Sequence, residues 1–325
     1  MIALKLKILP VACVCDNRIS TVRSSVGVLA VIISVVLSTL RRACLGLALA
    51  VGMLPAATAQ DAGALRARHA ALQEKFASNQ FGRPLVLEAV ETSGDLKGDI
   101  YTVVDHSFAT VQQALQSPEH WCDILILHLN VKGCRVAGAT NKTVSLNVGR
   151  KFDQPLENAS QLDFAYRVAS STPDYLQVLL SADEGPLGTR NYRIQVETIP
   201  LDAQRSVVHM SYAYAYGMAA RFAMQTYLST IGRDKIGFTI TGRTADGKPV
   251  YQGGVLGVLE RNTMRYYLAI DAYLAAFNLP AGEQVERRIH EWYANTERYA
   301  TQLHEMEEAE YLEMKRKEIR RQQQG

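Results

Sequence analysis

The sequence predicts an α+β fold in which a curved antiparallel sheet packs around a long helix near the C-terminus. Five segments between residues 143 and 216 alternate apolar and polar side chains, which is the pattern of half-buried strands. No long helical pattern separates them, so consecutive strands are expected to pair as an antiparallel meander. A helical pattern then runs from about residue 255 to residue 277 and ends before Pro280.

The strands of this meander are bounded by Gly, Pro, Asp or Asn, residues that favour turns. The strand candidates are residues 143–152, 162–169, 175–182, 190–199 and 206–216. Residues 172–174 and 201–204 are predicted as hairpin turns. In the last strand, alternation places Val208, Met210, Tyr212, Tyr214 and Tyr216 on one face and Val207, His209, Ser211, Ala213 and Ala215 on the other. The small side chains of the second face would allow a helix to approach closely.

The remaining elements flank the meander. Residues 61–78 have a helical pattern, and residues 84–90 and 99–104 are predicted as two strands around a turn at 93–95. Ser107 is an N-cap candidate for a helix over residues 108–116, and Pro118 begins a second short helix. A further helix is predicted at 219–231, followed by a glycine-rich connection. Residues 283–321 predict a charged helical tail.

A secretory signal peptide is predicted at residues 41–59. Arg41 and Arg42 precede an apolar run, and the small residues Ala57 and Ala59 favour cleavage after Ala59. The product would be periplasmic or secreted. The arginine pair also matches twin-arginine export, although any signal peptide can carry two arginines.

A second apolar run, residues 26–40, leaves three interpretations open: untranslated upstream sequence, which we favour, an extended signal region, or a retained anchor. This run is shorter than the roughly 20 residues that a membrane-spanning helix needs. Anchoring in the inner membrane through residues 26–57 is therefore the alternative localisation.

Charge and cysteine content narrow the classes of function. The chain has 35 Lys and Arg and 32 Asp and Glu, of which six basic and one acidic lie in residues 1–59, leaving a net charge of −2 beyond Ala59. This balance argues against a general nucleic-acid-binding protein. Beyond Ala59 only Cys122 and Cys134 remain, and in an exported protein they are expected to form a disulfide. The alternative is two buried thiols.

The order of strand, two short helices, antiparallel meander and long helix resembles the START-like helix-grip superfamily (SRPBCC), which includes lipid-transfer domains and polyketide cyclase-like proteins. Residues 100–121 look like its opening: a strand, a helix anchored by Phe108, and a short Pro-Glu-His-Trp element. The resemblance covers residues 88–277 and implies an apolar cavity between sheet and helix. The spacing of the two cysteines, the insert at 232–254 and the charged tail depart from the family pattern, and no catalytic residue carries over.

The chain is accordingly divided into four parts. Residues 1–59 are the N-terminal extension and signal peptide, 60–83 a helical lead-in, 84–280 the helix-grip domain, and 281–325 the charged helical tail.

Seven residues are candidates for ligand contact: His128, Asn130, Arg190, His209, Tyr212, Tyr214 and Tyr216. If their segment is extended, His128 and Asn130 share a face and either orient a ligand headgroup or form structural hydrogen bonds beside the disulfide. Arg190 either clamps an anionic group at the pocket mouth or pairs with Asp183 or Glu184 across a hairpin. Each tyrosine either contacts a ligand or packs within the sheet.

No Ser-His-Asp spacing, nucleotide-binding loop or metal-ligand motif occurs in the sequence, so no catalytic residue, cofactor or metal ligand is assigned. The basic end of the tail either contacts an anionic membrane or forms a solvated helix end. Its members are Lys315, Arg316, Lys317, Arg320 and Arg321.

These observations favour an exported binding protein that holds an apolar or amphipathic small molecule, a lipid for example, between the sheet and the long helix. One alternative is a cyclase- or hydrolase-like enzyme on the same scaffold, with His128, His209 or a tyrosine as acid or base. That enzyme requires two such groups to converge in one pocket. A third possibility is a scaffold protein of the cell envelope that acts through its 283–321 helix.

Overall fold

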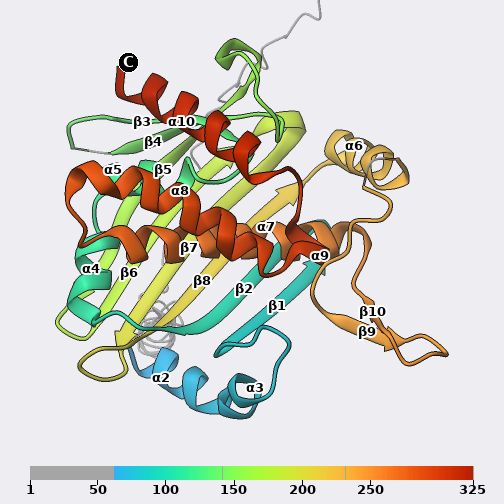
Figure 1. Cartoon of the computed structure of the whole chain (residues 1–325), viewed down its shortest axis with the longest axis horizontal. Helices are drawn as coiled ribbons and strands as arrows, with labels where there is room; N and C mark the ends of the chain where they lie inside the picture. Colours follow the sequence, from blue (N-terminus) through green and yellow to red (C-terminus); the bar gives the residue numbers. More distant parts are fainter. Residues whose placement is uncertain (1–61, 141, 231, 325) are drawn as a thin grey trace, which may run out of the picture. The chain divides into compact units, whose positions relative to one another are not determined.

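The structure is a computed structural model that describes residues 62–140, 142–230 and 232–324. Within these ranges an eight-stranded antiparallel sheet has the strand order β1-β2-β8-β7-β6-β5-β4-β3 (Figure 1). Its strands are β1 (Leu85–Thr92), β2 (Asp95–Val104), β3 (Val131–Ala137), β4 (Thr143–Val148), β5 (Ser160–Thr172), β6 (Tyr175–Glu184), β7 (Thr189–Pro200) and β8 (Ser206–Tyr216). The five predicted meander strands are β4 to β8, and the two predicted N-terminal strands are β1 and β2. The α+β prediction is confirmed.

The helices surround this sheet. They are α2 (Ala62–Ala71), α3 (Gln73–Ala77), α4 (Phe108–Leu115), α5 (Pro118–Leu125), α6 (Met218–Ser229), α7 (Gly254–Ala276), α8 (Ala281–Glu297), α9 (Ala300–Leu303) and α10 (Glu308–Gln324). Ser107 caps α4 by accepting a hydrogen bond from the Thr110 amide, and Pro118 lies in the first turn of α5, both as predicted. Two short 3-10 helices, η1 (Leu156–Asn158) and η2 (Pro186–Gly188), and a hairpin of β9 (Ile240–Arg243) and β10 (Pro249–Tyr251) lie in the connections.

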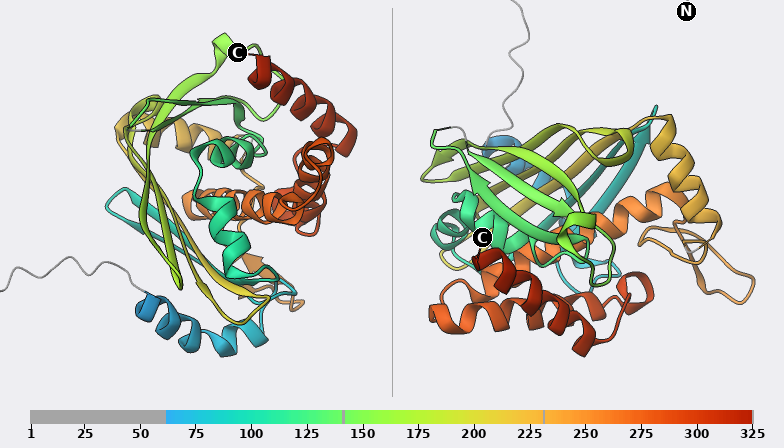
Figure 2. Two further views of the ribbon diagram at one scale, coloured as in Figure 1. Left: turned by 90° about the vertical axis from the view of Figure 1, so that its left-hand side faces the viewer. Right: turned by 90° about the horizontal axis from the view of Figure 1, so that it is seen from above.

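Helix α7 crosses the inner face of the sheet, as the long helical pattern predicted (Figures 1 and 2). Met264, Tyr267 and Leu268 of α7 are fully buried, and so are the inward-facing residues Val208 and Met210 of β8. The helix comes so close that a Cβ added at Gly98 of β2 would lie 2.2 Å from Thr263 Oγ1. Glycine at this position therefore permits the contact between α7 and the sheet.

The two faces of β8 have different neighbours. The long helix packs on the tyrosine face, whereas the shorter lead-in helix α2 lies on the opposite, outer face, where Leu65 is buried with Tyr175, Ile199 and Val207. Among the described residues, the helix on the small-residue face is therefore α2 and not α7. A ligand between the sheet and α7 would accordingly contact the tyrosine face.

The charged tail is not one helix. It forms α8, α9 and α10, and α10 returns along the edge strand β3 (Figure 1). Arg321 donates a hydrogen bond to the Lys132 carbonyl (2.6 Å), and the Cys134 amide donates to Gln322 Oε1 (2.9 Å). Helix α10 therefore occupies backbone groups that an open edge strand would offer to another chain.

A buried ion triad fixes α10 to the domain. Glu318 accepts from Lys132 (3.0 Å) and from Lys315 (2.7 Å), and all three side chains are at most 1% exposed. The Lys315 ammonium also donates to the carbonyls of His128 (2.8 Å) and Val131 (2.9 Å). Burial lowers the pKa of Lys315 to about 8, against the opposing effect of Glu318.

This triad corrects the membrane-contact prediction for Lys315, which is enclosed in protein. The neighbouring cations are also engaged: Arg316 pairs with Glu286 (2.7 Å) and Lys317 with Asp153 (2.5 Å). Arg320 is exposed. Among the described residues no helix is both long and apolar enough to span a membrane. The predicted signal peptide and the anchor at 26–57 lie outside the described residues and stay predictions.

Replacing Glu318 by Gln should destabilise the protein strongly. The substitution leaves two ammonium groups buried without a carboxylate, and removing one partner of a buried ion pair costs about 3–5 kcal/mol. The free energy of unfolding in urea measures the effect. The matched control is Lys317→Gln, which breaks an exposed ion pair on the same helix and should cost below about 1 kcal/mol. Equal effects of the two substitutions would contradict a structural role for the triad.

Candidate ligand-binding site

Three tyrosines define the candidate site between the sheet and α7. Tyr212 and Tyr214 come from β8 and are 6% and 7% exposed, and the partly buried Tyr266 faces them from α7. The alternation of β8 directs both of its tyrosines inward. No described residue hydrogen-bonds to any of the three hydroxyls, yet none of them is among the fully buried polar atoms without a partner. Each hydroxyl therefore reaches water-accessible space.

The rings of this site form a continuous row. The ring of His128 stacks on Tyr266 (centroids 4.6 Å apart), Tyr266 contacts Tyr212 (4.9 Å), and Tyr212 contacts Tyr214 (5.5 Å). Tyr192 of β7 continues the row by stacking on Tyr214 at 5.4 Å. Burial raises the pKa of Tyr212 well above its ordinary value, and the nearby phenols of Tyr266, Tyr192 and Tyr214 act in the same direction. These hydroxyls therefore stay protonated and are available as hydrogen-bond donors.

His128 takes part in this row, but in a conformation different from the one predicted. Residues 126–130 form turns after α5 instead of an extended segment, so His128 and Asn130 do not share the face of a strand. His128 Nδ1 accepts a hydrogen bond from the Asn130 amide (3.1 Å), which places the proton of the neutral ring on Nε2. Asn130 itself is structural, because its side chain donates to the Gly149 carbonyl (2.6 Å).

The His128 ring is held neutral. Burial, together with the nearby cations Arg265 and Lys315, lowers its pKa well below the ordinary value. Its Nε2–H group is buried without a partner. His128 can therefore donate one hydrogen bond, but it has no free nitrogen with which to accept a proton.

His209 lies on the opposite face of the sheet from the tyrosines. Its Nδ1 lies 2.8 Å from Glu197 Oε2, and its Nε2 lies 2.9 Å from Asp99 Oδ1. The ring stacks on Tyr101 (4.2 Å), beside a cavity of about 170 Å³ that helix α2 borders. Both ring nitrogens are occupied, so the site has the features of a structural ion cluster. His128 and His209 thus do not converge in one pocket, so these two histidines are not the acid–base pair that the enzyme alternative needs.

The ion cluster of His209 should make stability depend on pH. Burial opposes its charge, but the hydrogen bonds that His209 donates to Asp99 and Glu197 raise the pKa of His209 and lower the pKa of each carboxyl group. A raised histidine pKa gives stabilisation that is complete below about 6.5 and is lost as the pH rises through the raised value. The difference in unfolding free energy between the wild type and His209→Gln should therefore be larger at pH 6 than at pH 9. A difference that grows with pH would contradict the charged cluster.

Two other predicted ligand residues, Tyr216 and Arg190, do not belong to the row of rings. Tyr216 is half-buried and donates its hydroxyl hydrogen bond to Glu91, so its tip is already occupied. Arg190 is exposed on β7 opposite Glu184, yet no ion pair joins it to Asp183 or Glu184 in the described chain. The predicted hairpin bridge is therefore absent, and Arg190 remains available.

The disulfide between Cys122 and Cys134 is present, as predicted. It joins α5 to β3, with the two Cα atoms 5.2 Å apart. Closing a loop of this length contributes about 3 kcal/mol in the chain-entropy description. The bond fixes the turn that carries His128, because both ends of that turn are tied to each other.

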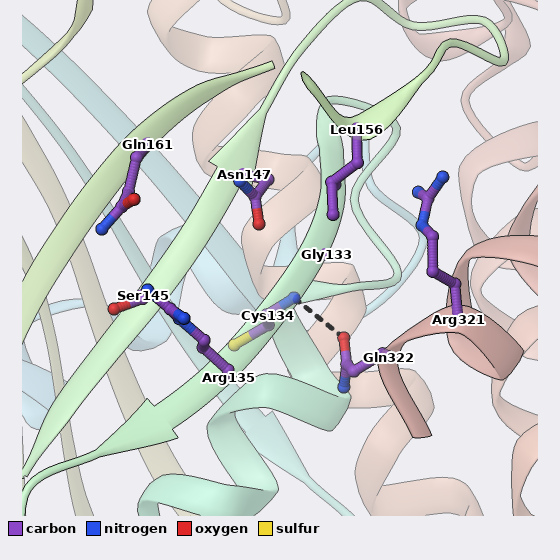
Figure 3. A pocket seen from close by; sticks show the side chains of 9 residues that line it. All are labelled: Gly133, Cys134, Arg135, Ser145, Asn147, Leu156, Gln161, Arg321 and Gln322. Atoms are coloured by element: carbon purple, nitrogen blue, oxygen red, sulfur yellow. Dashed lines mark hydrogen bonds between the residues drawn. The ribbon is translucent and has the colours of Figure 1, made fainter. Parts of the chain in front are cut away.

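Two further hollows lie away from the tyrosine row. One is a groove at β3 and β4 with a volume of about 330 Å³. Figure 3 shows the residues that line it, among them Asn147, Leu156 and Arg321. A wider cleft of about 540 Å³ contains the Arg83–Asp271 pair (2.9 Å) and His106. Neither hollow contains a predicted ligand residue. Within the described ranges, no group of three His, Cys, Asp or Glu side chains is placed to hold a metal ion.

Sequence reasoning missed Tyr266 and Tyr192 as site residues. The sequence indicates that Tyr266 belongs to the long helix and Tyr192 to a strand, but a helix–strand contact is not visible in local patterning. The feature that could have identified both residues is an aromatic ring with a polar tip at an inward-facing position.

No protein-family model matches the chain, and no curated protein matches it in sequence. Several solved structures are similar to it in the comparison of structures. Norcoclaurine synthase from Thalictrum flavum is 13% identical with a TM-score of 0.29, over 43% of this chain and 76% of that one. The Zhui aromatase/cyclase from Streptomyces sp. R1128 is 11% identical with a TM-score of 0.30, over 40% and 73%. A START superfamily protein from Mycobacterium smegmatis is 12% identical with a TM-score of 0.28, over 42% and 92%.

These similarities concern the fold and carry no activity or ligand to this chain. The strand order and the position of α7 across the inner face give the arrangement of a helix grip. The α+β helix-grip arrangement that the sequence predicted is confirmed.

Proposed function

We propose that the protein is an exported binding protein that holds an amphipathic small molecule between the tyrosine face of β8 and helix α7. The main support is the set of hydroxyls on Tyr212, Tyr214 and Tyr266, which have no hydrogen-bond partner among the described residues and reach water-accessible space. Such hydroxyls can exchange water for an acceptor group of a ligand. A ligand that lies along the rings and accepts hydrogen bonds at the hydroxyls would satisfy both the apolar and the polar parts of the site.

The shape of the site limits the ligand. Met264 and Leu268 of α7 close the deeper part of the interface and are at most 1% exposed. The ligand would therefore occupy the space at the tips of the tyrosines instead of passing through the whole core. A single alkyl chain with a polar end is the simplest molecule that combines an apolar part for the rings with an acceptor for the hydroxyls.

Export is supported by the disulfide as well as by the predicted signal peptide. Disulfides persist in oxidising compartments and are rare in the reducing cytosol. A periplasmic or secreted location would give the protein access to lipids and other amphipathic molecules of the envelope.

Binding is favoured over catalysis by the state of the two central histidines. His128 has no free acceptor nitrogen, and His209 is held between two carboxylates on the other face. The tyrosines are kept protonated by burial. The site thus offers donors that orient a ligand, without a general base beside them.

The double substitution Tyr212→Phe with Tyr266→Phe should weaken the binding of dodecan-1-ol roughly five- to thirtyfold, because two hydrogen bonds to the alcohol are lost. Displacement of the neutral fluorescent probe N-phenyl-1-naphthylamine measures the affinity. Tyr216→Phe is the matched control on the same strand, since its hydroxyl is bonded to Glu91, and it should bind like the wild type.

Native mass spectrometry of protein from its own envelope fraction provides an independent test, and we expect a bound small molecule. Failure to bind dodecan-1-ol or the probe, together with no co-purifying molecule, would contradict the proposed function.

A further inference from the structure

Four basic side chains surround one carboxylate beside the tyrosine row. Glu305, between α9 and α10, accepts from Lys151 (2.5 Å), Arg265 (2.7 Å) and Lys235 (3.1 Å). Arg261 lies one turn before Arg265 on α7, so both arginines lie on the same side of the helix. We call Lys151, Lys235, Arg261 and Arg265 the basic cluster.

The positive charge of the basic cluster exceeds the negative charge around it. Besides Glu305, the carboxylate of Glu260 acts on Arg261, and it accepts hydrogen bonds from the amides of Phe238 and Thr239 and from the Thr239 hydroxyl. Arg261 also donates to the Ile236 carbonyl (3.3 Å) and Arg265 to the Leu303 carbonyl (3.2 Å). Two carboxylates thus face four cations. Arg261 and Arg265 are only 2% and 1% exposed, and unbalanced charge at such positions costs several kcal/mol per ion.

The pKa shifts of Glu305 and Lys151 agree with this surplus of positive charge. Although burial acts in the opposite direction, Arg265 and Lys151 lower the pKa of Glu305 to about 2. Burial and Arg265 lower the pKa of Lys151 to about 8, despite its contact with Glu305. The carboxylate of Glu305 therefore does not by itself balance the three cations that contact it.

Hydrogen-bond donors in this region are also unused. The Nε–H groups of Arg261 and Arg265 are buried and have no acceptor, and the same is true of His128 Nε2–H. A buried donor without an acceptor costs about 1–3 kcal/mol, and three of those in the described residues lie in this one region. An anion with several oxygen atoms would satisfy both the donors and the surplus charge.

The basic cluster adjoins the proposed ligand site. Tyr266 directly follows Arg265 on α7, and its ring stacks on His128. His128 lies within the electrostatic range of both Arg265 and Lys151. The side chains of Lys151 and Lys235 are 28% and 31% exposed, so the cluster is accessible from solvent.

We infer that the ligand of the tyrosine site carries an anionic headgroup, a carboxylate or a phosphate monoester, and that the basic cluster binds this headgroup. The headgroup lies between the basic cluster and the tyrosine hydroxyls, so that it accepts hydrogen bonds from both, and the apolar chain extends along the rings of Tyr266, Tyr212 and Tyr214. This inference depends on the proposed function, because it assigns the chemical class of the same ligand.

The test compares amphiphiles that share a twelve-carbon chain and differ only in the headgroup: dodecanoate, dodecyl phosphate and dodecan-1-ol, with inorganic phosphate as the headgroup alone. The wild type should bind at least one of the two anions roughly tenfold or more tightly than the alcohol. The stronger of the two anions identifies the headgroup. Isothermal titration calorimetry below the critical micelle concentration gives each affinity.

The variants Lys151→Gln and Arg261→Gln should each reduce the preference for the anion roughly tenfold and leave the affinity for dodecan-1-ol unchanged. Arg150→Gln is the matched control, because Arg150 is an exposed cation next to Lys151 in the chain and should not alter the preference. Far-ultraviolet circular dichroism and the thermal midpoint confirm that each variant is folded.

The outcomes separate the two proposals. Equal affinities for alcohol and anions overturn the anionic headgroup and leave the proposed binding function intact. A preference that the two cluster variants do not change, or that Arg150→Gln abolishes equally, overturns the basic cluster as the headgroup site. Binding of inorganic phosphate as tight as that of dodecyl phosphate overturns the amphipathic ligand, and binding of none of the probes overturns both proposals.

Discussion

The close contact between α7 and the inner face of the sheet is the constraint on which the rest of the structure depends. Gly98 lets the helix backbone approach β2, and Thr263 occupies the space that a side chain would fill. This contact sets the height of α7 above β8 and hence the position of Tyr266 over Tyr212. Arg261 and Arg265 lie on the same helix as Tyr266, so the contact sets their positions as well. The aromatic row and the basic cluster are thus positioned by one packing interaction.

Buried charges are treated in two different ways in this molecule. In the triad of Lys132, Glu318 and Lys315, a shared carboxylate and two backbone carbonyls satisfy the ammonium groups. The network of His209 is likewise paired on both ring nitrogens. The basic cluster also uses carbonyl acceptors, yet the Nε–H groups of Arg261 and Arg265 have no acceptor. The two paired networks hold elements together, and the basic cluster is where we propose that a headgroup binds.

The His209 cluster and the tyrosine row lie on opposite faces of the sheet, because side chains alternate between the two faces along each strand. His209 and Tyr212 are only three positions apart on β8, yet one belongs to the ion cluster on the outer face and the other to the inner site. A polar group on the outer face can therefore stabilise the lead-in helix without changing the ligand site. The C-terminal helices act on the inner side, because α10 fixes the turn of His128 through Lys315 and the connection before it contributes Glu305.

Much of the fold was determined by the sequence alone. Period-two alternation located β4 to β8, helical periodicity located α7, and Ser107 and Pro118 marked the starts of α4 and α5, because these features depend on neighbours in the chain. The inward direction of Tyr212 and Tyr214 followed from the same alternation. The short strand β3 and the break of the tail into three helices were missed, because pairing with β4 and packing on α8 decide them.

The site was decided by the tertiary structure. Lys151, Arg265 and Glu305 are separated by many residues and meet only because α7, the loop after β4 and the turn before α10 converge. Local patterning also could not tell that Lys315 is enclosed while Lys317 is exposed, since both lie in one charged run. The sequence determined which residues alternate, cap and turn. The tertiary structure decided which charges are neutralised, because that depends on distances between elements that the local sequence does not encode.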